Sequence, residues 1–310
     1  MRWKILFSFC SALGYYLRMK ISEFYKKQKH TFSFEFFPPK TEEAEQKLFE
    51  TAGELRSLNP AFISVTYGAM GTTRANTLRI VSRVKKEIGI EAAAHLTCVG
   101  HTRDEIEGVA EELQQSGVEN IVALRGDPPK GETEFKPTPN GFRYASELVA
   151  FIKNHPKFAS AFSLAVAGYP ETHIECRDKV QDLEYLKQKV DQGADVVITQ
   201  LFFSNSHYFD FVERARKAGI KIPIVAGIMP VTHGPQVQRF ASMCGASIPE
   251  EMQRAIEKFG EDQPSVENYG IEFATRQCAE LLKNGVPGIH FYTLNKSRAT
   301  RQIYLNLGLA

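Results

Sequence analysis

The sequence predicts a single (β/α)8 barrel, and three observations support this fold. Eight short runs rich in β-branched and aromatic residues recur after residue 30, and helical patterns separate them. Alternating strands and helices favour parallel βαβ units, and eight such units are typical of a closed barrel. Neither G-x-G nor G-x-x-x-x-G-K-[ST] occurs in the 310 residues, so the phosphate-binding turn expected of an open nucleotide-binding sheet is missing.

Each predicted strand is a short run bounded by turn residues, as strands of globular proteins usually are. In chain order the runs are "TFSFEF" (31–36), "FISVTY" (62–67), "EAAAHLT" (91–97), "NIVALR" (120–125), "FSLAVAGY" (162–169), "DVVITQLFF" (195–203), "KIPIVAGI" (221–228) and "GIHFYTL" (288–294). Amphipathic patterns predict helices between them, most clearly over 41–58, 102–117 and 177–193, and two of these end on Gly117 and Gly193. Extra helices are expected over about 240–270, before the last strand.

The domain organisation is predicted to be one catalytic barrel over residues 31–310, preceded by an N-terminal extension over residues 1–30 for which no structure is required. The segment "MRWKILFSFCSALGYYL" has a basic start and an apolar stretch that is too short to span a membrane. Two interpretations of residues 1–18 stay open. They are an untranslated or loose appendage, with Met19 as an alternative start, or a helix in weak contact with a membrane surface.

Composition excludes several classes of partner. Lys and Arg number 38 and Asp and Glu 36, so the net charge is +2 and a nucleic-acid partner is not expected. The five cysteines are scattered without a C-x-x-C pair, which favours the reducing cytoplasm over a disulfide framework. His95-x-x-Cys98 and His173-x-x-Cys176 have no second pair at zinc spacing, and H-E-x-x-H is absent, so we predict no metal site.

Polar and aromatic residues collect at the predicted strand ends, where active sites lie in barrels of this kind. One polar strand end would be ordinary, because the chain leaves the core there, but seven of the eight predicted strands share the feature. In chain order the residues are Glu35, Thr66, Tyr67, His95, Thr97, Arg125, Gly126, Asp127, Tyr169, Gln200, Tyr292 and Asn295.

Two carboxylates in this set are expected to have different roles. Glu35 stands between Phe34 and Phe36, so we expect an apolar environment that raises its pKa and makes it a general acid near neutral pH. Asp127 follows Arg125 in a Pro-rich turn, where we expect it to stay ionised and to face a developing positive charge.

The motifs at these strand ends carry a resemblance to a known family. "SFEFFPP", "VTYGA", "HLTC", "ALRGDPP", "YASELV", "GYPETH", "ITQLFF", "GIMPV" and "HFYTLN" occur in this order. The chain resembles the bacterial 5,10-methylenetetrahydrofolate reductases from about residue 31 to its C-terminus. The resemblance implies a (β/α)8 barrel that binds FAD without a Gly-rich turn, in agreement with the strand count.

The implied reaction is a ping-pong hydride transfer through FAD. NADH or NADPH reduces the flavin, and 5,10-methylenetetrahydrofolate then takes the hydride and becomes 5-methyltetrahydrofolate, a methyl donor for methionine synthesis. Glu35 matches the family's catalytic acid, Asp127 a charge that stabilises the iminium form of the folate, and Gln200 an amide that contacts pterin or nicotinamide.

The resemblance also implies ligand contacts residue by residue. The implied flavin contacts are Thr66, Tyr67, Ala69, His95, Arg125, Gly126, Asp127, Tyr144, Ala145, Tyr169, His173, Asp182 and Lys189. The implied substrate contacts are Gln200, Gln236, Phe240, Tyr292 and Lys296. Asp182 and Lys189 share one helical face, where Lys189 would neutralise a phosphate; the alternative is a solvated surface face. The alternative for Phe240 is core packing.

Some expectations remain open. The chain departs from some bacterial relatives at Tyr185, Gln188 and Lys296, where they carry Asn, Arg and Arg. The family is commonly homo-oligomeric, and the absence of sequence beyond the barrel makes control by a regulatory domain unexpected. Two rival functions are a metal-dependent barrel lyase or hydrolase and a flavin- or folate-binding barrel without turnover.

Overall fold

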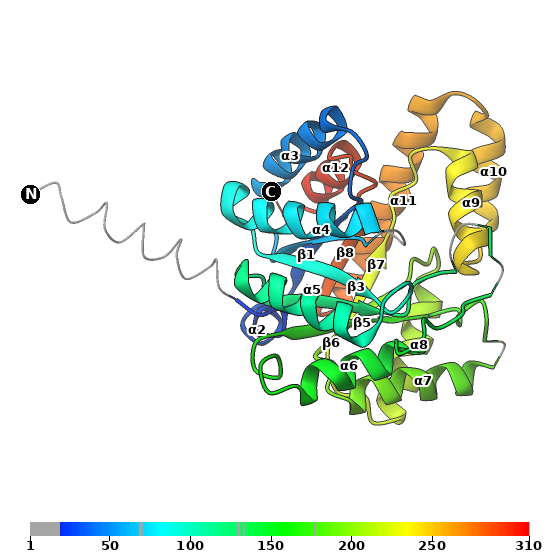
Figure 1. Ribbon diagram of the computed structural model, residues 1–310. Coiled ribbons are helices and arrows are strands. Elements are labelled where there is room, and N and C mark those ends of the chain that lie inside the picture. The colour runs from blue at the N-terminus through cyan, green and yellow to red at the C-terminus, as the bar shows by residue number, and fades with distance from the viewer. Residues whose placement is uncertain (1–18, 68–70, 129–130, 133, 177, 310) are drawn as a thin grey trace, which may run out of the picture.

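The computed structural model describes residues 19–67, 71–128, 131–132, 134–176 and 178–309, and it confirms the predicted (β/α)8 barrel. Eight strands of this described chain are all parallel and close in sequence order, with β8 beside β1 (Figure 1). They are β1 (Thr31–Phe36), β2 (Phe62–Val65), β3 (Ala92–Thr97), β4 (Asn120–Leu124), β5 (Ser163–Gly168), β6 (Val196–Thr199), β7 (Ile224–Ile228) and β8 (Gly288–Tyr292).

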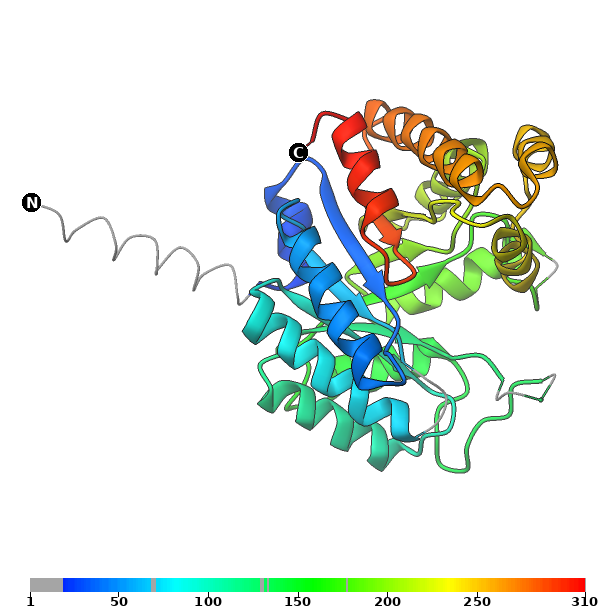
Figure 2. The same ribbon diagram turned by 90° about the horizontal axis from the view of Figure 1, so that it is seen from above.

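Most helices surround the strands, whereas α2 packs at the N-terminal end of the barrel (Figures 1 and 2). They are α2 (Ile21–Lys27), α3 (Glu42–Arg56), α4 (Gly71–Arg83) with the π-helical turn η1 (Val84–Ile88), α5 (Arg103–Gln115), α6 (Ala145–Asn154), α7 (Lys179–Asp191), α8 (Asn205–Lys217), α9 (Gly234–Cys244), α10 (Glu250–Phe259), α11 (Gln263–Lys283) and α12 (Arg298–Asn306). The expected extra helices before the last strand are α9, α10 and the start of α11. Within the described residues, none of these helices has the length and apolarity needed to cross a bilayer.

The alternation along β1 determines which side chains enter the barrel. Phe34 and Phe36 are fully buried and pack outward in the layer between strands and helices, where the Phe34 ring lies 6.0 Å from that of Tyr304 in α12. Successive residues of a strand face opposite sides. Ser33 and Glu35 therefore point inward, and their side chains contact groups from the other strands.

The sixth strand is shorter than the sequence predicts. The apolar run 195–203 suggests a strand over its whole length, whereas β6 ends at Thr199. Leu201 and Phe203 are buried, but they pack with residues of α9, α10 and α11 instead of extending the sheet. A continuous apolar run cannot distinguish a buried strand from a buried loop, so only the tertiary packing sets this boundary.

The second half of the N-terminal extension expected over residues 1–30 is structured. Residues 21–27 form α2, in which Ile21 is fully buried and Phe24 is 2% exposed. Both side chains pack into the N-terminal end of the barrel, against Phe62 and Ala93 among others. The Ile21 N–H also donates to the Asn120 side chain at 2.7 Å. This helix therefore belongs to the barrel, while residues 1–18 lie outside the described chain.

We predict that Phe24→Ala lowers the free energy of unfolding by about 3–4 kcal/mol, because it removes a buried aromatic ring from the barrel floor. Urea denaturation measures this change. The control is Lys26→Ala in the same helix, whose side chain is 69% exposed and whose removal should cost less than about 0.5 kcal/mol. Equal midpoints for Phe24→Ala and the unmodified chain would show that α2 does not contribute to the fold.

Candidate functional site

Glu35 lies near the carboxyl end of β1, inside the barrel, and is 8% exposed. The strand register places it beside Ser64 of β2 and Tyr292 of β8. Carboxylates are almost never this deeply buried unless other groups compensate the lost hydration. The surrounding side chains therefore decide what this carboxylate can do.

Two imidazoles and two hydroxyls provide that compensation. The Glu35 Oε2 atom lies 3.3 Å from His95 Nε2 and 3.4 Å from His290 Nε2. Behind it, the fully buried His290 contacts Ser33 Oγ through Nδ1 at 2.7 Å and Ser64 Oγ through Nε2 at 3.4 Å. A connected polar network thus runs from the barrel interior to the carboxylate.

The expected rise in the pKa of Glu35 is wrong. Burial alone raises the pKa of this carboxyl, but the nearby imidazoles of His95 and His290 more than offset that effect and lower it to about 2. The phenylalanines next to Glu35 in sequence face the helices, so they do not surround the carboxyl group. Glu35 is accordingly ionised near neutral pH.

The end of β1 is held in place by the loop after β8. Asn295 donates through Nδ2 to the Phe37 carbonyl at 2.9 Å and accepts from the Phe37 N–H at 2.8 Å. Thr293 Oγ1 donates to the Glu35 carbonyl at 2.6 Å. Asn295 adopts a positive φ of 59°, a conformation that asparagine tolerates better than most residues. The role of Asn295 is therefore to position the backbone around Glu35.

His95 presents an unsatisfied nitrogen at the end of β3. Its Nε2 atom makes no hydrogen bond within the described chain, so its contact with Glu35 is electrostatic. Thr97 Oγ1, two residues along the same strand, is likewise buried without a hydrogen-bond partner in the described chain. Buried polar atoms usually have partners, which makes both atoms candidates for contact with a bound molecule.

Arg125 and Asp127 lie at the end of β4. The Arg125 guanidinium donates two hydrogen bonds of 2.6 Å to the Glu175 carboxylate and stacks on Phe135, with 4.9 Å between its central carbon and the ring centroid. Between them, Gly126 has a φ of +86°, and a Cβ there would lie 2.5 Å from a Val99 methyl group. A side chain at position 126 would therefore clash, so the turn requires glycine. Asp127, the next residue, is exposed at the rim.

Tyr169, at the end of β5, joins several predicted residues. Its ring stands perpendicular to that of His173, with centroids 4.7 Å apart, and the Lys189 ammonium lies 5.8 Å from its centroid. Lys189 donates to the Ala167 carbonyl at 2.6 Å, and burial lowers the pKa of Lys189 to about 8 although Asp182 opposes this. Asp182 is itself buried, so the predicted pair is not a solvated surface face.

The residues predicted to contact the substrate lie on separate elements and make few contacts with one another. Phe240 of α9 and Tyr292 pack against the same apolar cluster, and the Tyr292 hydroxyl donates to the Thr199 carbonyl at 2.7 Å. The hydroxyl hydrogen of Tyr292 is therefore already engaged within the barrel. Gln200 accepts from the next backbone N–H at 2.9 Å. Gln236 lies on α9, half-buried, and Lys296 is exposed after β8.

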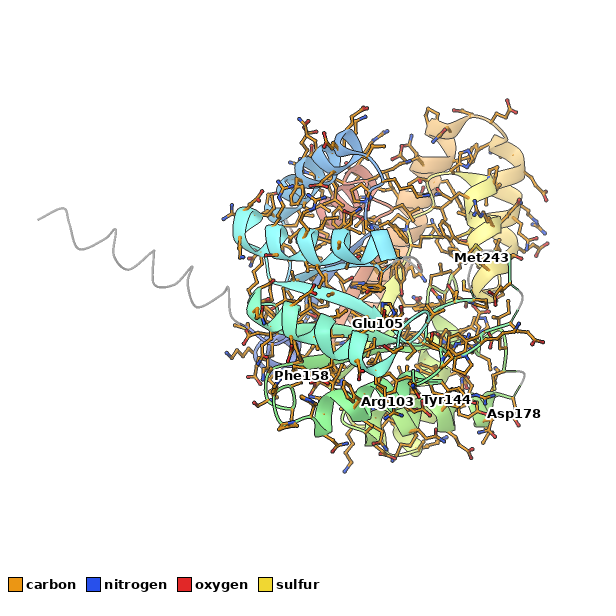
Figure 3. All side chains as sticks on the ribbon, in the orientation of Figure 1. Arg103, Glu105, Tyr144, Phe158, Asp178 and Met243 are labelled. Carbon is orange, nitrogen blue, oxygen red and sulfur yellow. The ribbon has the colours of Figure 1, made fainter. Side chains whose placement is uncertain are left out.

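The other predicted flavin contacts come from two segments, the loop after β2 and the start of α6. Thr66 donates its N–H to the Phe36 carbonyl, and the Tyr67 hydroxyl lies 3.1 Å from His101 Nε2. Tyr144 is 49% exposed immediately before Ala145, the first residue of α6; Figure 3 labels Tyr144 on the side of the molecule where Met243 of α9 also lies. Ala69 lies outside the described residues.

Sequence reasoning missed His290, Ser33, Ser64 and Glu175. A signal for His290 was present, because in "GIHFYTL" it precedes Tyr292 by two residues and a strand returns to the same face at that interval. Glu175 had no comparable signal, since its pairing with Arg125 depends on two separate loops. Among the described residues, no group of three or more His, Cys, Asp or Glu side chains is arranged to hold a metal ion.

A family model described as methylenetetrahydrofolate reductase matches residues 20–308. The chain belongs to this family. The match begins within the segment that precedes β1, in agreement with the place of α2 in the fold. The polar rim just described is therefore the rim of a methylenetetrahydrofolate reductase family barrel.

Curated relatives in this family come from plants and bacteria. The chain is 40% identical over 299 residues to "Methylenetetrahydrofolate reductase (NADH) 1" of Arabidopsis thaliana, a match that covers 94% of the chain and 50% of the plant protein. It is 40% identical over 277 residues to 5,10-methylenetetrahydrofolate reductase of Escherichia coli, covering 89% of the chain and 90% of that protein. The chain thus spans about half the length of its plant relative and most of the bacterial one.

Solved structures share the fold of the family barrel. A Clostridium thermocellum protein described as binding two copies of 5-methyl-5,6,7,8-tetrahydrofolic acid has a TM-score of 0.59 at 16% identity, covering 93% of the chain and 97% of that protein. Oxaloacetate acetylhydrolase has a TM-score of 0.51 at 10% identity, covering 88% and 79%. At these identities the likeness shows the barrel fold alone.

We predict that Glu35→Gln lowers the free energy of unfolding at pH 7 by on the order of 3 kcal/mol. Because the folded pKa lies below the ordinary 4.5, the carboxylate stabilises the fold fully above pH 4.5 and loses this effect as the pH falls towards about 2. Urea unfolding at pH 7, 5 and 3 should show a difference from the unmodified chain that shrinks at pH 3. The exposed Glu257→Gln is the control, and a constant difference for Glu35→Gln would contradict the lowered pKa.

Proposed function

We propose that the chain is an FAD-dependent methylenetetrahydrofolate reductase that converts 5,10-methylenetetrahydrofolate into 5-methyltetrahydrofolate with NADH or NADPH. The observation that carries the proposal is the buried carboxylate of Glu35 at the barrel rim, in contact with two imidazoles, within a chain of this family. The reaction needs a proton at the folate and negative charge beside a developing cation, and the rim offers groups suited to both roles.

The residues at the rim fit a flavin. His95 Nε2 and Thr97 Oγ1 are buried polar atoms that lack partners in the described chain, Gly126 keeps the backbone at the rim free of a side chain, and Lys189 supplies a cation for a phosphate. We propose that these residues, with Tyr67 and Arg125, hold FAD. When bound, FAD supplies the hydride chemistry that amino-acid side chains lack.

Glu35 is proposed to deliver the proton that opens the folate's five-membered ring. A carboxyl group with a pKa of about 2 holds no proton of its own near neutral pH, so the proton must reach it from a neighbour. The imidazoles of His95 and His290 lie within 3.4 Å of the carboxylate, and Ser33 and Ser64 contact His290 from behind. The lowered pKa therefore supports a carboxylate that passes a proton on, in place of the neutral acid expected from sequence.

Asp127, after β4, and Gln200, after β6, are also proposed to act on the substrate. Asp127 is exposed at the rim, and its charge acts on both Arg125 and Tyr169. A fixed negative charge there would stabilise the iminium cation without reorganisation during the reaction. The Gln200 amide, with the Phe240 and Tyr292 rings, would position pterin or nicotinamide, with Gln236 and Lys296 contributing polar contacts.

The wider context of this proposal follows from the family. We propose a homo-oligomeric cytoplasmic enzyme of one-carbon metabolism that supplies methyl groups for methionine synthesis. The plant relatives carry NADH in their names, which supports NADH as the reductant to test first. Neither nucleic acid nor a metal is part of the proposed reaction.

The decisive measurement is anaerobic stopped-flow absorbance of the flavin. For the unmodified chain we expect NADH or NADPH to bleach the bound flavin, and methylenetetrahydrofolate to restore its absorbance. Comparing the two nicotinamides under the same conditions identifies the reductant. A purified chain that neither contains nor takes up FAD would contradict the proposed function.

Glu35→Gln separates the two halves of the reaction. We expect this variant to bind FAD and to be reduced by the nicotinamide at a rate within about threefold of the unmodified chain, while reoxidation by the folate slows at least about a hundredfold, as expected for loss of an acid–base group. Glu257→Gln, an exposed substitution in α10, should leave both rates unchanged. Folate reduction by Glu35→Gln at the unmodified rate would remove Glu35 from the mechanism.

A further inference from the structure

A cavity of about 470 Å³ lies between the start of α8, α11 and the loop that joins α9 to α10. Figures 1 and 2 show α9, α10 and α11 together on one side of the barrel. A cavity of this volume is large enough for a small molecule. None of the residues that line it is among those proposed to hold flavin, folate or nicotinamide, so the proposed reaction gives it no role.

Asn205, the first residue of α8, has an unsatisfied oxygen in the wall of this cavity. It is 7% exposed, and its Nδ2 atom donates to the Gln277 carbonyl at 3.0 Å and to Glu280 Oε2 at 2.7 Å. Both partners are acceptors, which fixes the nitrogen on that side of the amide. The other atom, Oδ1, has no hydrogen-bond partner in the described chain. Gln277 and Glu280 also line the cavity, so the amide is part of its wall and its oxygen lacks a donor.

The backbone at the start of α8 has donors that lack acceptors. The N–H groups of Asn205 and Ser206 donate to no backbone carbonyl of the described chain, and the Ser204 side chain does not cap the helix. Ser204 Oγ lies instead 2.8 Å from Ser206 Oγ. Free N–H groups at the start of a helix, together with the helix dipole, favour a negatively charged group there.

The other lining residues combine charges of both signs with an apolar surface. Glu251 and Glu280 contribute carboxylates, and Arg276 contributes a guanidinium that donates to Glu251 at 3.0 Å. The apolar part of the wall consists of Phe203, Ile248, Pro249 and Phe273. The cavity therefore suits a molecule that carries a positive group, a negative group and an apolar body.

We propose that this cavity binds a zwitterionic α-amino acid with an apolar side chain. Its ammonium group donates to Asn205 Oδ1 beside the Glu280 carboxylate, and its carboxylate accepts from the N–H groups at the start of α8. Its side chain packs against Phe203 and Phe273. An amine without a carboxylate, or a carboxylate without an amine, would leave one of these two sets of polar groups unsatisfied.

The first test is isothermal titration calorimetry of the unmodified chain, with excess FAD present and three probes that share one ring. The probes are L-phenylalanine, phenethylamine, which lacks the carboxylate, and 3-phenylpropanoate, which lacks the ammonium. We expect L-phenylalanine to bind with a Kd on the order of 1 mM or tighter. The other two should bind at least about tenfold more weakly, as expected for loss of a charge-assisted hydrogen bond. Equal affinities for the three probes, or no binding of L-phenylalanine, would overturn the proposal.

Two substitutions test whether the probe binds at this place. Asn205→Ala removes the unpartnered oxygen and should weaken L-phenylalanine binding at least about tenfold. Glu280→Gln keeps an acceptor for Asn205 Nδ2 but removes a charge, and it should weaken binding about twofold to fivefold without weakening 3-phenylpropanoate. The control is Glu257→Gln, an exposed substitution in α10 outside the cavity lining, which should bind as the unmodified chain does.

Unchanged L-phenylalanine affinity in Glu280→Gln would place the bound probe elsewhere and overturn the proposal. Because Glu280 is exposed, this result does not depend on whether Asn205→Ala, a change at a buried position, folds. The titrations do not measure flavin reduction, so their outcome is separate from that of the proposed function. A chain that takes up no FAD contradicts the reductase proposal alone, whereas normal flavin turnover without amino-acid binding contradicts this inference alone.

Discussion

The buried carboxylate of Glu35 is the constraint on which the rest of this site depends. An ionised carboxyl group can remain inside the barrel only if other groups compensate its lost hydration. His95 and His290 do so, with Ser33 and Ser64 behind them. Because these residues lie on β1, β2, β3 and β8, the electrostatic requirement of one side chain holds together half of the barrel rim and explains why those strands carry polar residues toward the interior.

The rim divides into two regions with different chemistry. On the side of β1, β3 and β8, the imidazoles of His95 and His290 each lie within 3.4 Å of the Glu35 carboxylate. On the side of β4, β5 and α7, Arg125 and Lys189 lie among aromatic rings, which suits an anionic cofactor with a flat ring system. Arg125 and Lys189 are not among the groups that act on the Glu35 carboxylate, so the two regions are electrostatically distinct.

The pKa of Glu35 shows where inference from neighbouring residues fails. The phenylalanines on either side suggested an apolar environment, but alternation along a strand sends adjacent side chains to opposite faces. The groups that determine this pKa are His95, 60 positions away, and His290, 255 positions away. Sequence neighbours also fail to predict the place of α2, because a short amphipathic pattern does not identify the surface against which the helix packs. At the end of β6 they fail because an apolar run continues from the strand into a buried loop.

The sequence by itself determined the barrel, the order of its strands and most of the residues at its rim, because hydrophobic periodicity and glycine positions are local properties that follow from backbone geometry. It also carried the motifs that place the chain in its family. Only the tertiary structure decided the lowered pKa of Glu35, the contact of His290 with it and the pairing of Arg125 with Glu175. Each of these depends on distances between atoms that the chain brings together from separate strands and loops, and such distances are not encoded in any short segment.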